Sequence, residues 1–321
     1  MCVITSAMAL CACDGAQSAL NVAGTHAERI ASLFWWMVAG GALIWLLVVA
    51  LAVYATHIRP GRPHPRLALW LIVGGGVAFP VVVLTVLLVG GLIMMPQLRA
   101  PPGEADLQIA VSGEQWWWRV SYFTAEGPVE LANEIRLPVQ RRVTFVLSSP
   151  DVIHSFWIPP LGGKMDMIPG RVTYLTLEPT REGVFRGVCA EYCGASHAFM
   201  AFPVVVMAQE AFDQWLEAQA APAAPPQNAL ARRGQQAFLA NGCGACHTVR
   251  GTAADGGVGP DLTHVGSRLS LAAGVLDNGH PFFVRWLVDT ARIKPGVHMP
   301  AFGMLPEAQV DAIAAYLETL Q

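Results

Sequence analysis

The chain has 321 residues, a length that suggests two or three domains. Hydrophobic residues make up 54% of it and charged residues only 13%, a balance that is unusual for a wholly water-soluble protein. The formal net charge of −3 provides no broad positive field, so we expect no nucleic-acid partner.

The first 13 residues are apolar up to Cys13, which follows the small residue Ala12. This pattern resembles a bacterial lipoprotein signal, in which Cys13 would carry the lipid. The sequence lacks the positively charged start that such a signal usually has. Lipidation of Cys13, an unprocessed tail and a translation start upstream of Met1 therefore all stay open.

Two uncharged runs, at about residues 33–54 and 67–95, are long enough to cross a bilayer as helices. Trp35, Trp36 and Tyr54 flank the first run in the manner of interfacial aromatic residues. The loop at residues 57–66 carries three arginines and no acid, which places it in the cytoplasm. We predict a two-helix transmembrane hairpin in a bacterial inner membrane, with residues 99–321 on the periplasmic side. A buried hairpin of a soluble protein is the alternative.

Residues 106–207 change to short alternating runs separated by Pro, Gly and Asp. Many short strands with turn signals favour an antiparallel β-sandwich. The expected strands are 107–111, 116–123, 133–138, 142–148, 171–178, 183–188 and 202–207.

Residues 189–200 read CAEYCGASHAFM and place two thiols, an imidazole and a thioether close together. His154 lies upstream, on what we expect to be a loop at the same end of the sandwich. Such soft and borderline ligands suit copper. A disulfide would leave the His and Met offsets unexplained, and a mononuclear blue-copper site needs only one cysteine. We interpret the motif as a binuclear copper site, with bridging thiolates Cys189 and Cys193, terminal ligands His154 and His197, weak axial ligand Met200, and the Glu191 carbonyl as sixth donor.

The motif C-x-E-x-C-G-x-x-H-x-x-M, with SPDVIHSFWIPPLGGKMDMIPGR and GEQWWWRVSYF upstream, resembles the CuA domain of cytochrome c oxidase subunit II. The match covers roughly residues 15–218 and implies a cupredoxin-like fold for residues 99–218. It also implies that Trp116 is the exposed tryptophan where electrons enter, with core packing as the alternative. The Glu191 carboxylate would help to bind Mg²⁺ at the junction with subunit I. Asp166 and Arg171 would lie at the same junction, with a surface ion pair as the alternative.

The resemblance further implies partnership with oxidase subunits I and III, membrane lipid around the hairpin, and a donor such as cytochrome c or another periplasmic carrier. One departure from the family pattern concerns proton uptake. Family members often carry a glutamate near the cytoplasmic start of the second helix, whereas residues 67–73 here read LALWLIV. The route of proton entry therefore stays open, as does the haem type of subunit I.

Residues 219–228 form a Pro- and Ala-rich linker, which could be extended. After it, Cys243, Cys246 and His247 form the C-x-x-C-H signature of covalent haem c attachment, although zinc and thiol redox sites share this spacing. Residues 229–321 resemble a class I cytochrome c. This resemblance implies Met299 as the second axial ligand, with Met304 and His298 as alternatives, and Pro260 as the residue whose carbonyl orients His247.

A last helix is expected at residues 306–320, with an apolar face that packs against Gly234 and Phe238. The predicted chain is thus multidomain, with a two-helix transmembrane hairpin, an all-β cupredoxin-like sandwich and an all-α class I cytochrome c domain. The function that these parts imply is electron entry into a haem-copper oxidase, which reduces oxygen in subunit I and translocates protons. A CuA-bearing subunit of a nitric oxide reductase, and a membrane-anchored redox sensor or copper chaperone, are the alternatives.

Overall fold

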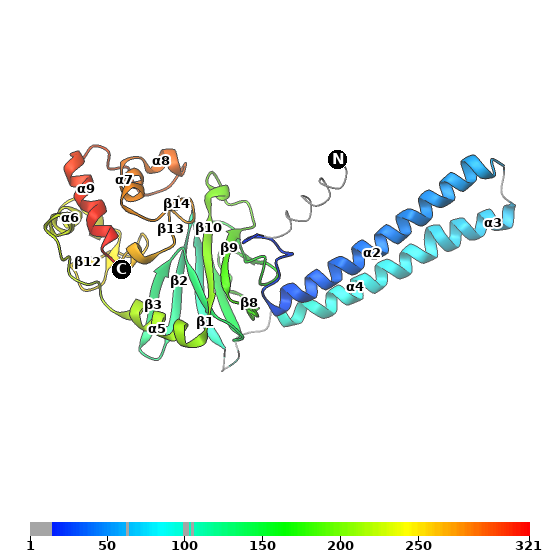
Figure 1. Cartoon of the computed structure of the whole chain (residues 1–321), viewed down its shortest axis with the longest axis horizontal. Helices are drawn as coiled ribbons and strands as arrows, with labels where there is room; N and C mark the ends of the chain where they lie inside the picture. The colour runs from blue at the N-terminus through cyan, green and yellow to red at the C-terminus, as the bar shows by residue number, and fades with distance from the viewer. Residues whose placement is uncertain (1–14, 62–63, 99–102, 104–105) are drawn as a thin grey trace, which may run out of the picture.

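The computed structural model describes residues 15–61, 64–98, 103 and 106–321, so Cys13 lies outside the described residues. Three parts follow one another in space as they do along the chain. A long helical hairpin leads to a β-sandwich, and a small helical domain covers the far end of the sandwich (Figure 1). The order of the three parts agrees with the predicted fold class.

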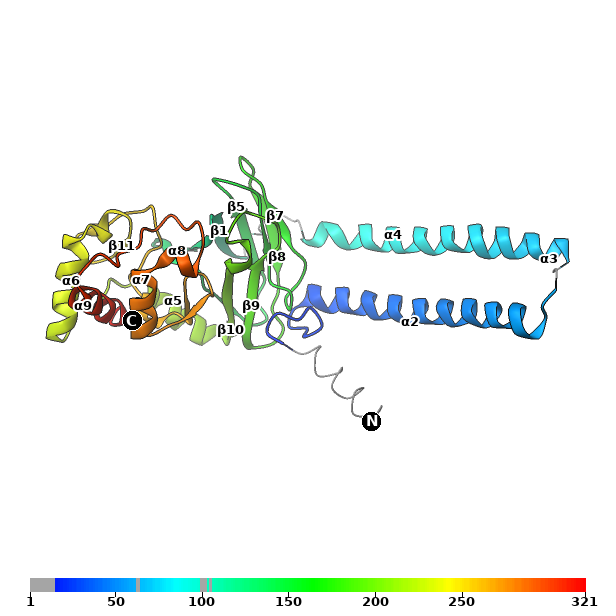
Figure 2. The ribbon, with the colours of Figure 1, turned by 90° about the horizontal axis from the view of Figure 1, so that it is seen from above.

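The hairpin consists of two helical spans that run alongside each other in opposite directions (Figure 2). The first comprises α2 (Thr25–Val53) and the π-helical segment η1 (Tyr54–Ile58). The second comprises α3 (Pro65–Trp70), the π-helical segment η2 (Leu71–Ala78) and α4 (Phe79–Leu98). The apolar windows of Thr25–Ile58 and Pro65–Ile93 have none of their residues buried inside the protein. Helices of this length that carry a long uncharged stretch of exposed apolar side chains are suited to cross a membrane.

Helix α2 begins earlier than the hydropathy pattern predicts, because its first turn is part of the sandwich and not of the apolar span. Ala27 is 2% exposed, and its N–H donates a hydrogen bond to the carbonyl of Leu161. Gly24 can approach Leu161 closely, since a Cβ at this position would lie 2.6 Å from the Leu161 carbonyl oxygen. The hairpin is therefore anchored to the sandwich at the base of α2.

Two five-stranded sheets form the sandwich, in the orders β3-β2-β1-β5-β8 and β4-β10-β9-β6-β7. The first sheet contains β1 (Leu107–Glu114), β2 (Trp117–Thr124), β3 (Gly127–Ala132), β5 (Val143–Ser148) and β8 (Thr173–Leu177). The second contains β4 (Ile135–Pro138), β6 (His154–Trp157), β7 (Met165–Met167), β9 (Gly183–Cys189) and β10 (Ala201–Met207). Helix α5 (Gln209–Ala220) follows and packs Phe212 near Tyr122.

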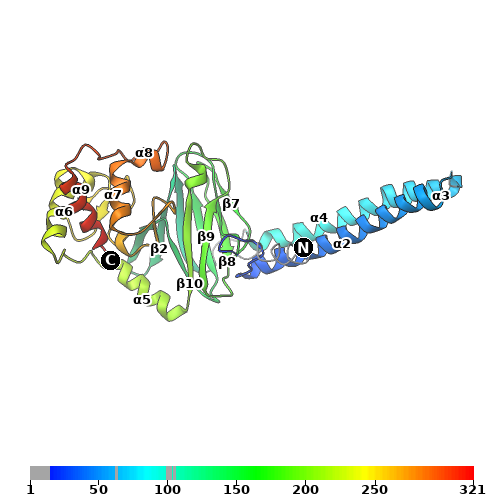
Figure 3. The same ribbon diagram turned by 45° about the horizontal axis from the view of Figure 1, so that its top comes forward.

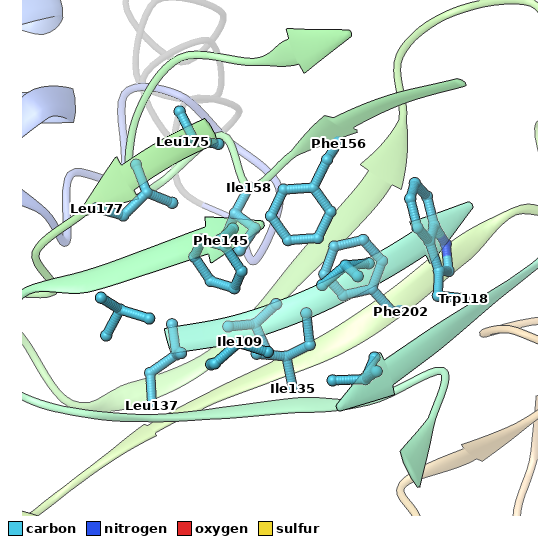
Figure 4. Packing of buried hydrophobic residues seen from close by; sticks show 14 of the residues in the cluster. Ile109, Trp118, Ile135, Leu137, Phe145, Phe156, Ile158, Leu175, Leu177 and Phe202 are labelled. Atoms are coloured by element: carbon cyan, nitrogen blue, oxygen red, sulfur yellow. The ribbon is translucent and has the colours of Figure 1, made fainter. Parts of the chain in front are cut away.

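Apolar side chains from both sheets meet in one core, which Figure 4 shows from close by. Phe156 and Phe202 stack with ring centroids 5.1 Å apart, and Trp118 meets Phe202 edge to face. Burial of such aromatic pairs stabilises the sandwich beyond the apolar area alone. The alternation of buried and half-buried residues along β1 agrees with the predicted period of two.

The sheets differ from the prediction in two respects. They are mixed and not purely antiparallel, since β1 pairs with β5, and β10 with β4, in the parallel sense. In addition, strands β3, β6 and β7 were not predicted. His154 is therefore the first residue of a strand and does not lie on a loop, as was expected.

The C-terminal domain is mainly helical, with α6 (Ala229–Ala240), α7 (His280–Val288), α8 (Thr290–Ile293) and α9 (Glu307–Glu318). Two short ladders, β11 (Thr248–Val249) with β12 (Ala254–Asp255) and β13 (Ser270–Leu271) with β14 (Leu276–Asp277), lie between them. A Cβ at Gly234 of α6 would collide with the carbonyl of Ala312, and Phe238 meets Tyr316 edge to face. The predicted packing of the last helix on Gly234 and Phe238 is confirmed.

The helical domain sits directly on the sandwich (Figures 1 and 3). Several hydrogen bonds cross the junction. Arg119 donates to the Gly257 carbonyl (2.9 Å), the Leu269 N–H to Glu134 (2.7 Å), the Ser196 hydroxyl to the Pro295 carbonyl (2.6 Å), and the Ala201 N–H to the Ala273 carbonyl (3.1 Å). The connecting segment also packs on the helical domain, because the Ala223 N–H donates to the Arg250 carbonyl. The chain thus holds the two domains in a fixed contact.

Candidate copper and haem sites

The sulfur and nitrogen atoms of the predicted copper ligands converge at one end of the sandwich. Strand β9 ends at Cys189, beside the start of β6, where His154 lies, and beside the start of β10. The ligand atoms of His154, Cys189 and Cys193 all lie within 4.8 Å of one another. The two Sγ atoms are 3.8 Å apart and both cysteines are free, so they do not form the alternative disulfide.

The other predicted ligands complete the same cluster. Nδ1 of His197 lies 3.5 Å from Sγ of Cys193, and Sδ of Met200 lies 3.8 Å from the same sulfur. The Glu191 carbonyl oxygen is 3.2 Å from Sγ of Cys189. Two thiols, two imidazoles, a thioether and one carbonyl therefore face a common space, and this donor set fits a pair of soft copper ions.

Asp151, which the sequence analysis missed, orients His154. Nε2 of His154 donates to Oδ1 of Asp151 over 2.9 Å, which leaves Nδ1 on the side of Cys189. Asp151 is itself held by the N–H groups of Val152 and Gln115. A carboxylate that fixes the ring of a metal-binding histidine is common in proteins, and an acid three residues before His154 could have indicated it.

The charges in this cluster favour one thiolate. A hydrogen bond from the Cys193 thiol lowers the pKa of Cys189, and His154 and backbone N–H groups contribute, whereas burial opposes the shift. The same shared proton raises the pKa of Cys193. Burial lowers the pKa of His154, but hydrogen bonds with Cys189 and Asp151 outweigh burial and raise it overall. Thiolate is the form of cysteine that binds metals.

Trp116 connects the copper cluster to the helical domain. Its indole Nε1 donates to the Cys193 carbonyl over 2.9 Å, and the side-chain amide of Gln115 donates to the same oxygen over 2.8 Å. The resemblance implies an exposed tryptophan, but Trp116 is only 6% exposed. The helical domain covers it, since the rings of Trp116 and His298 are 6.3 Å apart and a Cβ at Gly296 would lie 2.8 Å from the indole.

The predicted haem-binding residues lie on one loop of the helical domain. Cys243 and Cys246 are free thiols around the short helix η4 (Cys243–Ala245). Nδ1 of His247 donates to the Pro260 carbonyl over 2.8 Å, so Nε2 is left for iron. Burial lowers the pKa of His247, which favours the neutral imidazole that binds metals. Gly259 leaves room beside the ring, because a Cβ there would lie 2.6 Å from Cε1 of His247. These residues fit a covalent haem.

The three candidates for the second axial ligand differ in their surroundings. Met299 is half-buried and packs against the core of the helical domain, and its carbonyl accepts a hydrogen bond from Thr290 over 2.9 Å. Met304 is 76% exposed. His298 is exposed and lies near Trp116. The surroundings favour Met299.

The residues predicted to face subunit I lie on another side of the cluster of copper ligands. The Glu191 carboxylate is half exposed and lies 3.9 Å from Nζ of Lys164, which pairs with Asp166 at 2.7 Å. Hydrogen bonds from Lys164 and Ser155 lower the pKa of Asp166. Asp166 and Arg171 also line an open hollow of about 530 Å³. Asp166 is thus paired within the chain, and Arg171 faces the hollow.

Comparison with known proteins gives the same two parts. The family described as cytochrome c oxidase subunit II, periplasmic domain, matches residues 123–209, and the cytochrome c family matches residues 231–321. Cytochrome c oxidase subunit 2 of Alkalihalophilus pseudofirmus is 35% identical over 82% of this chain and 76% of its own length. The chain belongs to the cytochrome c oxidase subunit II family.

Other relatives cover less of the chain. Cytochrome c oxidase subunit 2 of Bacillus sp. PS3 is 32% identical over 66% of this chain and 62% of its own length. Among solved structures, the periplasmic domain of subunit II (CoxB) of Bradyrhizobium japonicum is 32% identical, covering 36% of this chain and 95% of its own, with a TM-score of 0.35.

Family membership makes this chain a subunit of a haem-copper oxidase, an oxidoreductase, with subunit I as its partner. The subunit II domain implies CuA copper, and the cytochrome c domain implies haem c. The two apolar spans fit a membrane-anchored subunit II whose two folded domains lie outside the bilayer.

Proposed function

We propose that this subunit II takes electrons from a periplasmic carrier at its haem c site and hands them across Trp116 to its CuA site. From there it delivers them to subunit I, where oxygen is reduced to water with proton translocation. The observation that carries this proposal is the position of Trp116, whose side chain contacts both the predicted copper ligand Cys193 and the helical domain.

At the entry side, Cys243 and Cys246 would form thioether bonds to the haem, and His247 and Met299 would bind its iron. When bound, the haem and the copper pair supply the one-electron carriers of the chain. The hydrogen bond from Nδ1 of His247 to Pro260 holds the imidazole in one orientation. A His and Met ligand set gives a high haem potential, which suits a carrier that feeds an oxidase.

Between the sites, the protein keeps Trp116 rigid. The indole is held at Nε1 by the Cys193 carbonyl and is covered by Gly296 and His298. Because it is buried, an external carrier has no direct access to it. The resemblance assigns the entry of electrons into the copper site to Trp116. Its burial under the helical domain supports this role, with the helical domain of the same chain as the electron donor.

At the copper site, Cys189 and Cys193 would bridge the two ions, with His154, His197, Met200 and the Glu191 carbonyl completing the ligand set. Bridging thiolates let one electron spread over both ions. Asp151 and Gln115 then hold the surrounding loops, so that little has to move when the charge changes.

At the exit side, the Glu191 carboxylate, Lys164, Asp166 and Arg171 would face subunit I. We propose that Glu191 contributes one oxygen ligand to Mg²⁺ at that junction, since Mg²⁺ is bound by few carboxylates and keeps several waters. Subunit III, a periplasmic donor and membrane lipid complete the proposed partners, in a bacterial inner membrane.

The test is stopped-flow reduction of the purified oxidase by a reduced c-type cytochrome, following haem c and the near-infrared copper absorbance together. We expect haem c to be reduced first, and copper to follow with oxygen consumption. Copper reduced before haem c, or a haem c that stays oxidised during turnover, would reject the proposed order.

A further inference from the structure

A lysine lies buried at the contact between the helical domain and the copper loop. Lys294 is 2% exposed and follows directly after α8. Its Nζ donates to the Ala272 carbonyl over 2.9 Å. Lysine is almost never fully buried in proteins without a partner, so its position at a domain contact calls for a specific explanation.

Lys294 joins two segments of the helical domain. The first is the tip between β13 and β14, residues 272–274, where Ala272, Ala273 and Gly274 all have positive φ values (53°, 59° and 80°). This left-handed conformation is unfavourable for alanine, so the tip needs support from its surroundings. The hydrogen bond from Nζ of Lys294 to Ala272 provides such support. The second segment is the turn at residues 295–298, which follows Lys294 in the chain.

Both segments touch the copper loop, residues 193–201. At the tip, the Ala273 carbonyl accepts the N–H of Ala201, the residue after Met200. At the turn, the Pro295 carbonyl accepts the hydroxyl of Ser196, the residue before His197, and Gly296 packs on Trp116. Ala201, at the end of the copper loop, and Ser196, in its middle, are therefore each held by one segment, and Lys294 links the segments.

We propose that Lys294 is a positioning residue for electron transfer from the helical domain to the copper site, because it ties the tip and the turn together so that both are seated on the copper loop. This inference rests on the proposed relay. The hydrogen bond of Lys294 goes to Ala272, which is not one of the predicted copper or haem ligands.

The test compares K294M with R292M in the complete oxidase. Methionine keeps most of the length of lysine but has neither the charge nor the N–H donors. Arg292 lies in α8, two positions before Lys294, and is exposed, so R292M removes a positive charge without touching the contact.

The first readout is amide hydrogen exchange at Ala201, whose N–H is bonded to the tip. We expect exchange about tenfold faster in K294M and unchanged in R292M, since loss of one stabilising interaction of about 1.4 kcal/mol corresponds to this factor. The second readout is haem-to-copper transfer after photoreduction of the haem. We expect K294M to slow it about tenfold and R292M to leave it unchanged.

Unchanged exchange and an unchanged rate in a K294M protein with normal haem and copper spectra would overturn the inference. A slower rate in K294M together with an unchanged rate in R292M would support the inference. If K294M does not assemble, S196A removes the hydroxyl that holds the turn, and an unchanged transfer rate there would also count against the inference. Absence of haem-to-copper transfer in the wild type would instead reject the proposed function.

Discussion

The indole N–H of Trp116 donates a hydrogen bond to the carbonyl oxygen of Cys193 over 2.9 Å, while the ring lies under the turn that carries Gly296. One side chain thus contacts a copper ligand and the domain that holds the predicted haem ligands. Trp116 differs from an exposed tryptophan that receives electrons from an external carrier, because the helical domain, the proposed electron donor, already covers it.

Replacement of Trp116 should slow transfer into copper and leave the copper site intact. We expect W116F to reduce the haem-to-copper rate by about tenfold or more, a change of about 1.4 kcal/mol in the barrier. The near-infrared copper band should be unchanged. W117F is the matched control, because Trp117 lies under Arg119 on strand β2. Equal rates in the two variants would contradict the role of Trp116.

Loss of the Asp151 carboxylate should weaken copper binding. Because Asp151 holds the ring of His154, we expect D151N to lose copper to a chelator roughly 10- to 100-fold faster than the wild type. D213N serves as the control, since Asp213 is exposed and bonded only within α5 through Gln209. Copper retention equal to that of the control would show that Asp151 does not orient the histidine.

The second axial ligand can be assigned by a pair of methionine variants. M299L should lower the haem potential by at least about 59 mV, which is a tenfold change for one electron, because it removes the thioether that favours ferrous haem. M304L should leave the potential unchanged, because Met304 is 76% exposed. Spectroelectrochemical titration measures both. A shift in M304L alone would reassign the ligand.

Tyr122 should stabilise the sandwich through its hydroxyl. The hydroxyl donates to the Arg136 carbonyl (3.0 Å) and accepts the Arg136 N–H (2.8 Å), and the residue is fully buried. We expect Y122F to lower the free energy of unfolding by about 1–3 kcal/mol, because the Arg136 groups lose their partner. Y174F, at a half-buried position on β8, should change it much less. Denaturant unfolding compares the two.

Lys294 predicts a specific pH dependence. Burial lowers its pKa to about 7, whereas the ordinary value is 10.5. Between these values the unfolded chain binds the proton that the folded chain has released, so this group makes stability rise with pH. The free energy of unfolding of the wild type should gain up to about 1.4 kcal/mol per pH unit relative to K294M in this window. Parallel stability curves for the two proteins between pH 7.5 and 9.5 would contradict this prediction.

The sequence allowed the parts of the fold and most of the sites to be predicted, because their signals are local. Cys189, Cys193, His197 and Met200 lie within one loop, and Cys243, Cys246 and His247 within another. The uncharged runs indicated the hairpin by length alone. The contact of the last helix with Gly234 and Phe238 was also predicted, but Ala312 and Tyr316, which lie outside the predicted apolar repeat, take part in it.

The errors concern features that depend on distant partners. Strand β6 is only four residues long and buried on both sides, so it shows no alternation, and His154 was placed on a loop. Strand β3 begins at Gly127 and Pro128, residue types that favour turns, and no strand was predicted there. The cover over Trp116 could not be predicted, because residues 229–321 carry seven basic and seven acidic residues and give no sign of how the domain docks.

The most direct test of the relay is laser-flash reduction of haem c in the complete oxidase, followed at the haem and near-infrared copper bands over a range of protein concentrations. The relay through Trp116 predicts that copper is reduced with the same rate constant as haem c is reoxidised, and that this constant does not depend on protein concentration. A rate that rises in proportion to concentration, or copper that stays oxidised while haem c is reduced, would show that the two sites of this chain are not connected in series.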